Sequence, residues 1–569
     1  MSRSPVAALV AVLALVAAAC TGASGASSAS GTGAPSAGPS ASVSGEPMNG
    51  TTRRLEREVC AQNSHEVLLR TWRGVMLGRS GDIQIIAKYP SFVHGGLTHS
   101  TPYDYTQEVP LFLYGPGYVK PGVYDAPMTL ADVAPTAGQI LKFDFPAPDG
   151  RAHTEGLLPA DQRPLPRLLV TLIWDAAGTY VLNRWKRDWP YLRSLLPHGA
   201  WFTNVTLGSS PSNTPTGHSV IGTGAFPMHN GMVDEYIRVN GRIEKPNENG
   251  PAFMVDPTLA DLYDRAMGNR PIVGAVATLA AHIMMMGHGS EWGGGDKDIA
   301  ITREKEFAAT AGAESTTWNL TPDMAPFYTL PSHVNQLPPL STYVDALDRA
   351  DGVRDGKWRS DSIAQLSNGF DTPARTPFQT TLLESLIQHE GFGTDDVPDL
   401  LYVNYKAIDT ISHLFSADSV EMSDAVKYQD DALRELVGFL NRTVGKGKWV
   451  LALLSDHGSQ RDPAVSGAFL IDIDRLTQDI AQRFDGDGDG VPLIEKVRPT
   501  EIWLNQAELK DNGYTPAQVS QYIMGLTQAD TIKAGTTPTP GQANDTVFSA
   551  ALPSSILSRL PCLPEARGS

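Results

Sequence analysis

The hydrophobic pattern of the chain is a series of short, nearly continuous apolar runs separated by segments with helical periodicity. The clearest apolar runs are Leu168–Trp174, Leu400–Tyr405 and Trp449–Leu454. Each has the length of a strand and is followed by polar residues, which is typical of strands covered on both faces. Helical patterns lie between the runs, at 257–267, 377–389 and 423–440. The alternation predicts an α/β fold with a central, mostly parallel sheet.

The first residues follow a different pattern. One arginine precedes a short apolar run, and small residues then lead to Cys20, which is typical of an export signal. A cysteine directly after three alanines resembles a bacterial lipoprotein signal; ordinary secretion with cleavage nearby is the alternative. We expect residues 1–19 to be removed, Cys20 to carry a lipid, and residues 20–52 to form a disordered Ser/Gly/Ala-rich tether. No later stretch could span a membrane, so this lipid would anchor the protein at the outer face of the cell membrane.

The composition sets the size of the core and excludes one class of partner. Of the 569 residues, 41% are hydrophobic and 19% are charged, which is enough for a large globular core. A formal net charge of -17 argues against a nucleic-acid-binding surface, which needs a basic patch. Small anionic substrates remain compatible, because a cation in a cleft can reverse the local field.

Polar side chains follow the predicted strands where functional groups of α/β sheets gather, just beyond the carboxyl ends. Asp175 follows the first apolar run, and Asp456 and His457 follow the last. Asp409 and His413 come soon after the middle run, at a spacing that places them on one helix face. Aspartate carboxylates and histidine imidazoles are common metal ligands in proteins. Taken singly, each stretch also fits a polar turn or a surface pair.

Thr214 begins a further segment with a candidate catalytic residue. It lies just before Gly217 and His218 at a predicted helix start. A hydroxyl at a helix N-terminus lies in a field that favours bound anions, including phosphate. A nearby metal can lower its pKa and make it a nucleophile. A plain helix cap is the alternative.

Together these elements resemble the two-metal alkaline phosphatase superfamily, most closely its threonine-nucleophile branch, which includes nucleotide pyrophosphatases/phosphodiesterases. In that branch an Asp ends the first strand, and a Thr nucleophile lies four residues before a His. Asp-x-x-x-His and Ser-Asp-His-Gly stretches follow. The matching residues, in the same order, are Asp175, Thr214, His218, Asp409, His413, Asp456 and His457. The resemblance implies an α/β/α sandwich with a central mostly parallel sheet and a cap insertion.

One family ligand is displaced along the chain. The branch has a last His after the Asp-His-Gly strand, but no histidine follows His457 here. The stretch Thr98–Tyr105, with His99, carries that signature, and residues 78–90 and 109–141 resemble its usual neighbours. We therefore interpret the chain as circularly permuted. An unrelated N-terminal domain with a chance resemblance is the alternative.

This interpretation divides the catalytic domain, residues 53–569, into parts. They are 53–145 (the normally C-terminal segment), 166–233 and 377–470 (the metal and nucleophile core), 234–376 (a cap) and 471–569 (remaining sheet or accessory region). Cys60 and Cys562 form an even pair in an oxidising compartment, so a disulfide is expected. It would fasten the new ends together. Two free buried thiols are the alternative.

The resemblance implies a zinc-dependent phosphoric ester hydrolase that acts on small phosphorylated substrates through a phospho-threonine intermediate on Thr214. One Zn2+ would bind Asp409, His413 and His99, and the other would bind Asp175, Asp456, His457 and the Thr214 oxygen. Four alternatives remain open. They are phosphodiester or nucleotide pyrophosphate cleavage, phospholipase C-like hydrolysis, sulfate-ester hydrolysis, and a non-catalytic surface binding protein.

Other residues are candidates for substrate or calcium binding. Glu235 stands where the branch has an Asn that touches a phosphoryl oxygen, and a carboxylate there repels phosphate unless it is protonated or bridged by a cation. The glycine-rich stretch 284–298, with His288, predicts a loop that faces the substrate; a plain surface loop is the alternative. The run DGDGDG resembles the start of a Ca2+ loop, and its candidate ligands are Asp485, Asp487 and Asp489.

Overall fold

The computed structural model describes residues 47–567, apart from 95, 247–249, 293–294 and 304–317. The expected signal peptide, Cys20 and most of the expected tether lie outside these residues. The last residues of that tether are not a coil, because helix α2 (Gly50–Gln62) begins within them. Within the described ranges, no helix is long and apolar enough to cross a membrane.

The larger sheet has nine strands in the described part of the chain and contains the three apolar runs that the sequence predicts as strands. Its order is β13 (Tyr328–Thr329), β12 (Asp298–Ile301), β11 (Val273–Val276), β16 (Asp399–Tyr405), β6 (Leu168–Trp174), β17 (Trp449–Leu454), β3 (Leu111–Tyr114), β7 (Ala200–Phe202) and β4 (Gly122–Tyr124). From β13 to β17 the neighbours are parallel, whereas β3 is antiparallel to β17 and β7. The predicted α/β fold with a mostly parallel central sheet is confirmed.

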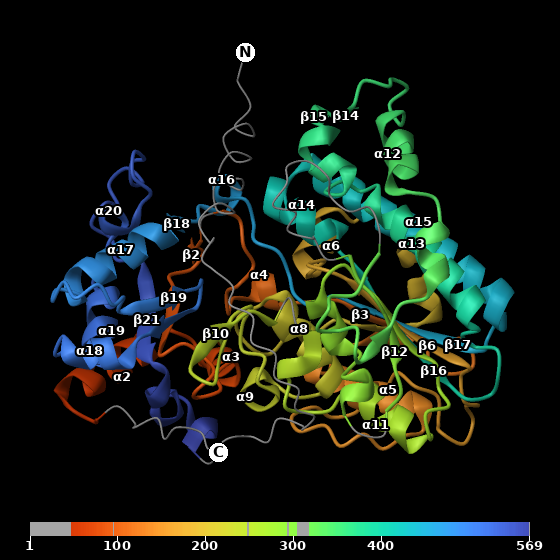
Figure 1. Ribbon diagram of the computed structural model, residues 1–569, viewed down its shortest axis with the longest axis horizontal. Coiled ribbons are helices and arrows are strands. Elements are labelled where there is room, and N and C mark those ends of the chain that lie inside the picture. The colour runs from red at the N-terminus through yellow and green to blue at the C-terminus, as the bar shows by residue number, and fades with distance from the viewer. Residues whose placement is uncertain (1–46, 95, 247–249, 293–294, 304–317, 568–569) are drawn as a thin grey trace.

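Helices cover both faces of this sheet, because successive strand residues point to opposite sides. Along β6, Val170 and Leu172 enter one core, while Leu169 and Ile173 enter the other. The helices on the first face include α13 (Arg375–Glu390) and α15 (Val420–Leu440), and those on the second include α5 (Val133–Leu141), α8 (Thr214–Thr223) and α11 (Leu259–Ala266) (Figure 1). The arrangement is the expected α/β/α sandwich.

A smaller antiparallel sheet joins the two ends of the folded chain. Its order is β19 (Ile494–Val497), β20 (Glu501–Leu504), β1 (Ile83–Ala87) and β21 (Phe548–Pro553). β1 thus lies between strands from the far end of the sequence, where red and blue ribbons meet in Figure 1. The helices that cover its two faces are α17 (Ile473–Phe484) and α19 (Pro516–Met524) on one side, and α2 and α3 (His65–Arg73) on the other.

Cys60 and Cys562 form a disulfide bond, and their Cα atoms lie 5.8 Å apart. Cys60 belongs to α2, near the start of the described chain, and Cys562 lies near its end. The expected disulfide is therefore confirmed, and it joins the two ends of the folded region.

The range 234–376, expected to form a cap, also builds part of the larger sheet. β11, β12 and β13 fall within it and extend the sheet beyond β16. The expectation of a cap is wrong for these three strands. Their short runs, such as Val-Gly-Ala-Val in β11, lack the long continuous apolar pattern of the central strands.

Shorter elements complete the described chain. Further α-helices in the described ranges are α4 (Asp104–Gln107), α6 (Thr179–Arg184), α7 (Pro190–Leu195), α9 (Pro227–Asn230), α12 (Leu340–Asp348), α14 (Ala407–Phe415), α16 (Pro463–Ser466), α18 (Gln506–Asp511) and α20 (Gln528–Thr531). Short strand pairs are β5 (Met128–Thr129) with β8 (Val205–Thr206), β9 (Ile237–Val239) with β10 (Arg242–Glu244), β14 (Lys357–Trp358) with β15 (Asp361–Ser362), and β2 (Phe92–Val93) with β18 (Leu470–Ile471).

Candidate active site

The site residues expected from the sequence converge at one edge of the larger sheet, where β6, β16 and β17 end. Asp175 directly follows β6, and Asp456 and His457 follow β17. Helix α14 begins just after β16 and carries Asp409 and His413 one turn apart. Parallel neighbours bring their carboxyl ends to the same edge, so these side chains lie close together.

Thr214 is the first residue of α8, directly after the cap residue Asn213. The side-chain oxygen of Asn213 accepts a hydrogen bond from the backbone N–H of Thr216 at 3.3 Å, which fixes the start of the helix. The Thr214 hydroxyl lies 3.5 Å from Nε2 of His457. The candidate nucleophile is thereby held at the end of β17.

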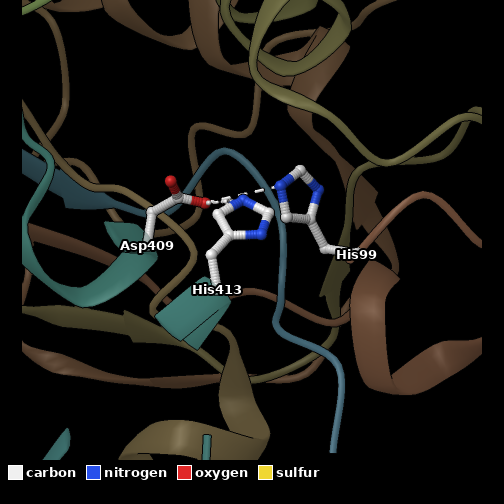
Figure 2. Close-up of side chains that lie close together, drawn as sticks. All are labelled: His99, Asp409 and His413. Atoms are coloured by element: carbon white, nitrogen blue, oxygen red, sulfur yellow. Dashed lines mark ion pairs between the residues drawn. The ribbon is translucent and has the colours of Figure 1, made fainter. Parts of the chain in front are cut away.

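The first ligand cluster consists of His99, Asp409 and His413 (Figure 2). Nε2 of His99 lies 3.4 Å and Nε2 of His413 lies 3.5 Å from Oδ1 of Asp409. Nδ1 of His99 donates to the carbonyl of Ser212, and Nδ1 of His413 donates to the carbonyl of Leu97 at 2.8 Å. Because each Nδ1 donates to a carbonyl, Nε2 is the ring nitrogen that faces the Asp409 carboxylate and that would bind a metal.

The second expected ligand set is Asp175, Asp456, His457 and Thr214, and of these Asp175 and His457 gather with Asp409, with one ligand atom of each within 4.8 Å of the others. Nδ1 of His457 donates to the carbonyl of Gly458 at 2.9 Å, so its Nε2 lone pair is free. That Nε2 lies 3.2 Å from Oδ2 of Asp456 and 3.7 Å from Oδ1 of Asp175. Both carboxylates are fully buried. The two clusters adjoin, because the rings of His99 and His457 stack with centroids 3.8 Å apart.

Both clusters fit a divalent cation. Oδ1 of Asp409 and Oδ2 of Asp456 are buried and accept no hydrogen bond from any residue that the structure describes. A buried carboxylate oxygen without a partner is costly, and a cation between it and the facing imidazoles would satisfy it. Backbone carbonyls that fix the tautomers of His99, His413 and His457 are the usual support for imidazole ligands. The nitrogen and carboxylate donors suit zinc among other metals.

Three further side chains in the site were not expected from the sequence. Lys406 donates to the Thr214 hydroxyl at 2.9 Å. Asn404 donates to Oδ2 of Asp175 at 2.8 Å. His282 accepts backbone N–H groups at Nδ1, so its protonated Nε2 faces Oδ2 of Asp175, 3.4 Å away. Asn404 and Lys406 stand at the carboxyl end of β16, so the strand-end rule could have found them.

Charges in the site reinforce one another. Burial would raise the pKa of Asp175, but the Lys406 ammonium outweighs burial and holds that pKa below its usual range. Burial would lower the pKa of Lys406, but Asp175 and Asp409 outweigh it, so the amine stays protonated. Burial also opposes charge on His413, yet Asp409 raises its pKa to about 9. The same negative field would hold a metal cation. Burial lowers the pKa of His457 to about 4, which keeps that imidazole neutral.

Glu235 is paired with a cationic side chain, that of Arg498. A carboxylate beside a bound phosphate would need such a partner. Nη2 of Arg498 donates to Glu235, and its Nε donates to Asp234 at 3.3 Å. Burial would raise the pKa of Glu235, but Arg498, followed by His99 and His413, lowers it. Glu235 therefore lies in the field of the first cluster, with its charge offset by Arg498.

His288 has partners other than the ligand clusters. Its Nδ1 lies 2.8 Å from Oδ2 of Asp261 in α11, and its ring stacks on Trp292 with centroids 4.0 Å apart. The ring is fully buried. These contacts explain the position of His288 without a substrate.

The acidic run near residue 487 gathers differently from the expected calcium loop. Asp485 and Asp487 lie near Glu508 of α18. Asp489 instead accepts the backbone N–H of Val491 at 2.7 Å. Asp489 thus lies outside the group that Asp485 and Asp487 form with Glu508, and calcium binding by the three aspartates stays a prediction.

The chain is similar in sequence and in fold to known proteins. The family model described as type I phosphodiesterase / nucleotide pyrophosphatase matches residues 169–546. Alkaline phosphatase PafA of Elizabethkingia meningoseptica is 22% identical over 417 residues, 63% of this chain and 73% of that protein. Alkaline phosphatase PhoD of Zymomonas mobilis subsp. mobilis is 24% identical over 395 residues, 62% and 65% of the two. The crystal structure of wild-type PafA aligns with a TM-score of 0.51 at 18% identity, covering 68% of this chain and 84% of that one.

Fold and site together define a hydrolase of the phosphatase and phosphodiesterase type. The matched family model spans more than half of the chain, so the chain belongs to the type I phosphodiesterase/nucleotide pyrophosphatase family, within the alkaline phosphatase superfamily. The resemblance seen in the sequence is confirmed at this level.

Proposed function

We propose that the protein hydrolyses small phosphate esters outside the cytoplasm, through a covalent phospho-threonine on Thr214 at a two-zinc site. The position of the Thr214 hydroxyl carries this proposal, because it lies 3.5 Å from His457 and beside both ligand clusters. The similarity to PafA and PhoD, both alkaline phosphatases, supports a phosphate ester as the substrate.

The chemistry follows from the place of Thr214. Bound zinc would offset the charge on the reacting oxygens, held by His99, Asp409 and His413 on one side and by Asp175, Asp456 and His457 on the other. The Thr214 Oγ–P bond forms while the P–O bond to the alcohol breaks; the hydroxyl proton passes to solvent, and the departing alcohol takes one up. A water then attacks phosphorus, the bond to Oγ breaks, and Thr214 regains its proton.

Replacement of the nucleophile tests this function. Thr214→Ala should abolish turnover of a phosphate ester while bound zinc, measured by elemental analysis, stays at the wild-type level. Thr154→Ala, at an exposed position, is the matched control and should keep full activity. A fully active Thr214→Ala protein overturns the proposal. A phosphate monoester, a diester and a sulfate ester compared on the wild type separate the ester classes left open by the sequence.

The proposal includes export and a lipid on Cys20. The apolar run that ends in Ala-Ala-Ala-Cys supports it. Cys20→Ala should abolish incorporation of a labelled fatty acid and release the protein from the membrane fraction. Retention of Cys20→Ala in that fraction contradicts the anchor.

We also interpret the chain as a circular permutant of its family. Two observations support this interpretation. The family model begins at residue 169, whereas His99 reaches Asp409 from a segment that precedes it. That segment also supplies β1 to the smaller sheet and β3 to the larger one.

A further inference from the structure

Lys406 brings an ammonium group into contact with the nucleophile and with two carboxylates of the site. Its Nζ lies 2.9 Å from the Thr214 hydroxyl oxygen and 3.1 Å from each carboxylate oxygen of Asp175. It also lies 2.8 Å from Oδ2 of Asp409. The residue is 8% exposed and sits between β16 and α14. The ammonium group is therefore fixed beside Thr214.

The direction of the hydrogen bond defines what Lys406 does to Thr214. An ammonium group only donates, so the Thr214 oxygen accepts from Lys406 and its own proton points elsewhere. A charge-assisted donor stabilises an oxygen that gains negative charge. The same three-proton head can turn toward another oxygen nearby, because lysine is a point charge with rotating donors.

We propose that Lys406 is a catalytic residue of the phosphoryl transfer. Its ammonium group orients the Thr214 hydroxyl before attack and donates to a phosphoryl oxygen as the Oγ–P bond forms. This inference rests on the proposed function, since it assigns a partner to the nucleophile. None of the motifs that carry the family resemblance includes Lys406.

Lys406 leaves two carboxylate oxygens of the site to metal cations. Lys406 contacts both oxygens of Asp175 and Oδ2 of Asp409. The oxygens without a hydrogen-bond partner among the described residues are different ones, Oδ1 of Asp409 and Oδ2 of Asp456. Three buried carboxylates also exceed the charge of one ammonium group. Lys406 thus leaves these two oxygens to metal cations, and a cation on Asp175 and Thr214 would share them with its ammonium group.

Lys406→Met tests the inference, because it keeps the length of the side chain and removes the charge. We expect kcat to fall about 100-fold, with a smaller change in KM and with melting temperature and zinc content unchanged. The affinity for vanadate, a mimic of the transferring phosphoryl group, should fall more than the affinity for inorganic phosphate. Lys406→Arg should restore part of kcat and part of the affinity for vanadate. Lys427→Met, at a half-exposed surface lysine, is the control and should change neither.

Two outcomes overturn the inference. One is wild-type kcat and vanadate affinity in Lys406→Met. The other is loss of zinc or a lower melting temperature in both Lys406 variants, which assigns a structural role. Thr214→Ala separates the two proposals. If that variant is active, the proposed function fails; if it is inactive while Lys406→Met is fully active, only the role of Lys406 fails.

Discussion

His99 owes its orientation to one backbone carbonyl. Its Nδ1 donates to the carbonyl of Ser212, so Nε2 is the ring nitrogen that faces Asp409. We predict that His99→Ala loses about one equivalent of zinc and at least about 100-fold in kcat, because the first cluster keeps a single imidazole. Elemental analysis and steady-state kinetics measure the two effects. His65→Ala, which removes an exposed imidazole, should change neither. Full zinc content in His99→Ala contradicts the prediction.

Asp264 makes stability depend on pH. Burial, followed by the nearby Asp296, raises the pKa of Asp264 from 3.8 to about 7. Because the folded pKa lies above the unfolded one, the folded state binds the proton more tightly, and the free energy of unfolding falls as pH rises from about 4 to about 7. Asp264→Asn should therefore raise the melting temperature by a few degrees above about pH 7 and hardly change it below about pH 4.

Thermal unfolding across this pH range checks the prediction for Asp264. Asp161→Asn, at an exposed position, is the control and should not alter the pH dependence. A shift in melting temperature that is equal at both ends of the range would show that folding does not raise the pKa of Asp264.

Sequence reasoning located the residues of the site that motifs or strand ends mark. Asp175 and Asp456 follow apolar runs, so the parallel sheet alone brings them together. Lys406 occupies a comparable strand end but belongs to no motif of the resemblance. His282 comes from a short 3-10 helix (Ala280–Met285) packed against α8. Its approach to Asp175 depends on tertiary packing, which no local pattern encodes.

Helix α8 approaches the end of β17 at a glycine. A Cβ atom at Gly217 would lie 2.7 Å from the carbonyl oxygen of Asp456 and 2.9 Å from its Cβ. Gly217→Ala must therefore move the helix, and with it Thr214, away from the strand end. We predict a loss in kcat of at least about 10-fold and a lower melting temperature. Kinetics and thermal unfolding measure these effects.

The control for Gly217 is another helical glycine with free space. A Cβ at Gly438 in α15 would meet only the tip of Arg442, at 3.3 Å. Gly438→Ala should leave kcat unchanged and stabilise the protein by up to about 1 kcal/mol, because alanine favours the helix. Wild-type kcat in Gly217→Ala would show that α8 and β17 can separate without harm to the site.

At the scale of the whole molecule, the two sheets differ in how far the sequence predicts them. The centre of the larger sheet follows from the apolar runs, since β6, β16 and β17 are buried on both faces. The smaller sheet does not follow from such a pattern. Its strand β1 pairs with β20 and β21 from the far end of the chain, and pairing over that separation is decided by packing.

The disulfide stabilises the closed chain. Cys60 and Cys562 are 502 positions apart. A cross-link over such a long loop lowers the conformational entropy of the unfolded chain, which raises the free energy of unfolding by about 2–5 kcal/mol. We predict that Cys60→Ser/Cys562→Ser melts several degrees below the wild type with unchanged kcat, because α2 packs on the smaller sheet, away from the strand ends that hold the site. Reductant should lower the melting temperature of the wild type but not of the variant. Equal melting temperatures without reductant contradict the prediction.

If the chain is a permutant, it can be reopened between α5 and β6, where the segment with His99 joins the first strand of the core. The Cα atoms of Cys60 and Cys562 lie 5.8 Å apart, and α2 carries residue 50 about 15 Å from Cys60, a span that a flexible linker of about ten residues from 567 to 47 can bridge. The new ends would be Asp161 and Ala160, which are exposed between α5 and β6. Permutation is tolerated at such sites. The order of segments in this chain then matches the usual order of the family.

The reopened chain should fold with wild-type zinc content and a kcat within a few-fold of wild type, because the strand pairs of both sheets are unchanged and His99 still reaches Asp409. Zinc analysis, kinetics and circular dichroism measure this. A chain opened inside α8, between Gly222 and Thr223, is the control and should not fold, since that cut breaks a buried helix. If the reopened chain folds but lacks zinc, the segment with His99 needs its present connection, and the interpretation of the chain as a permutant fails.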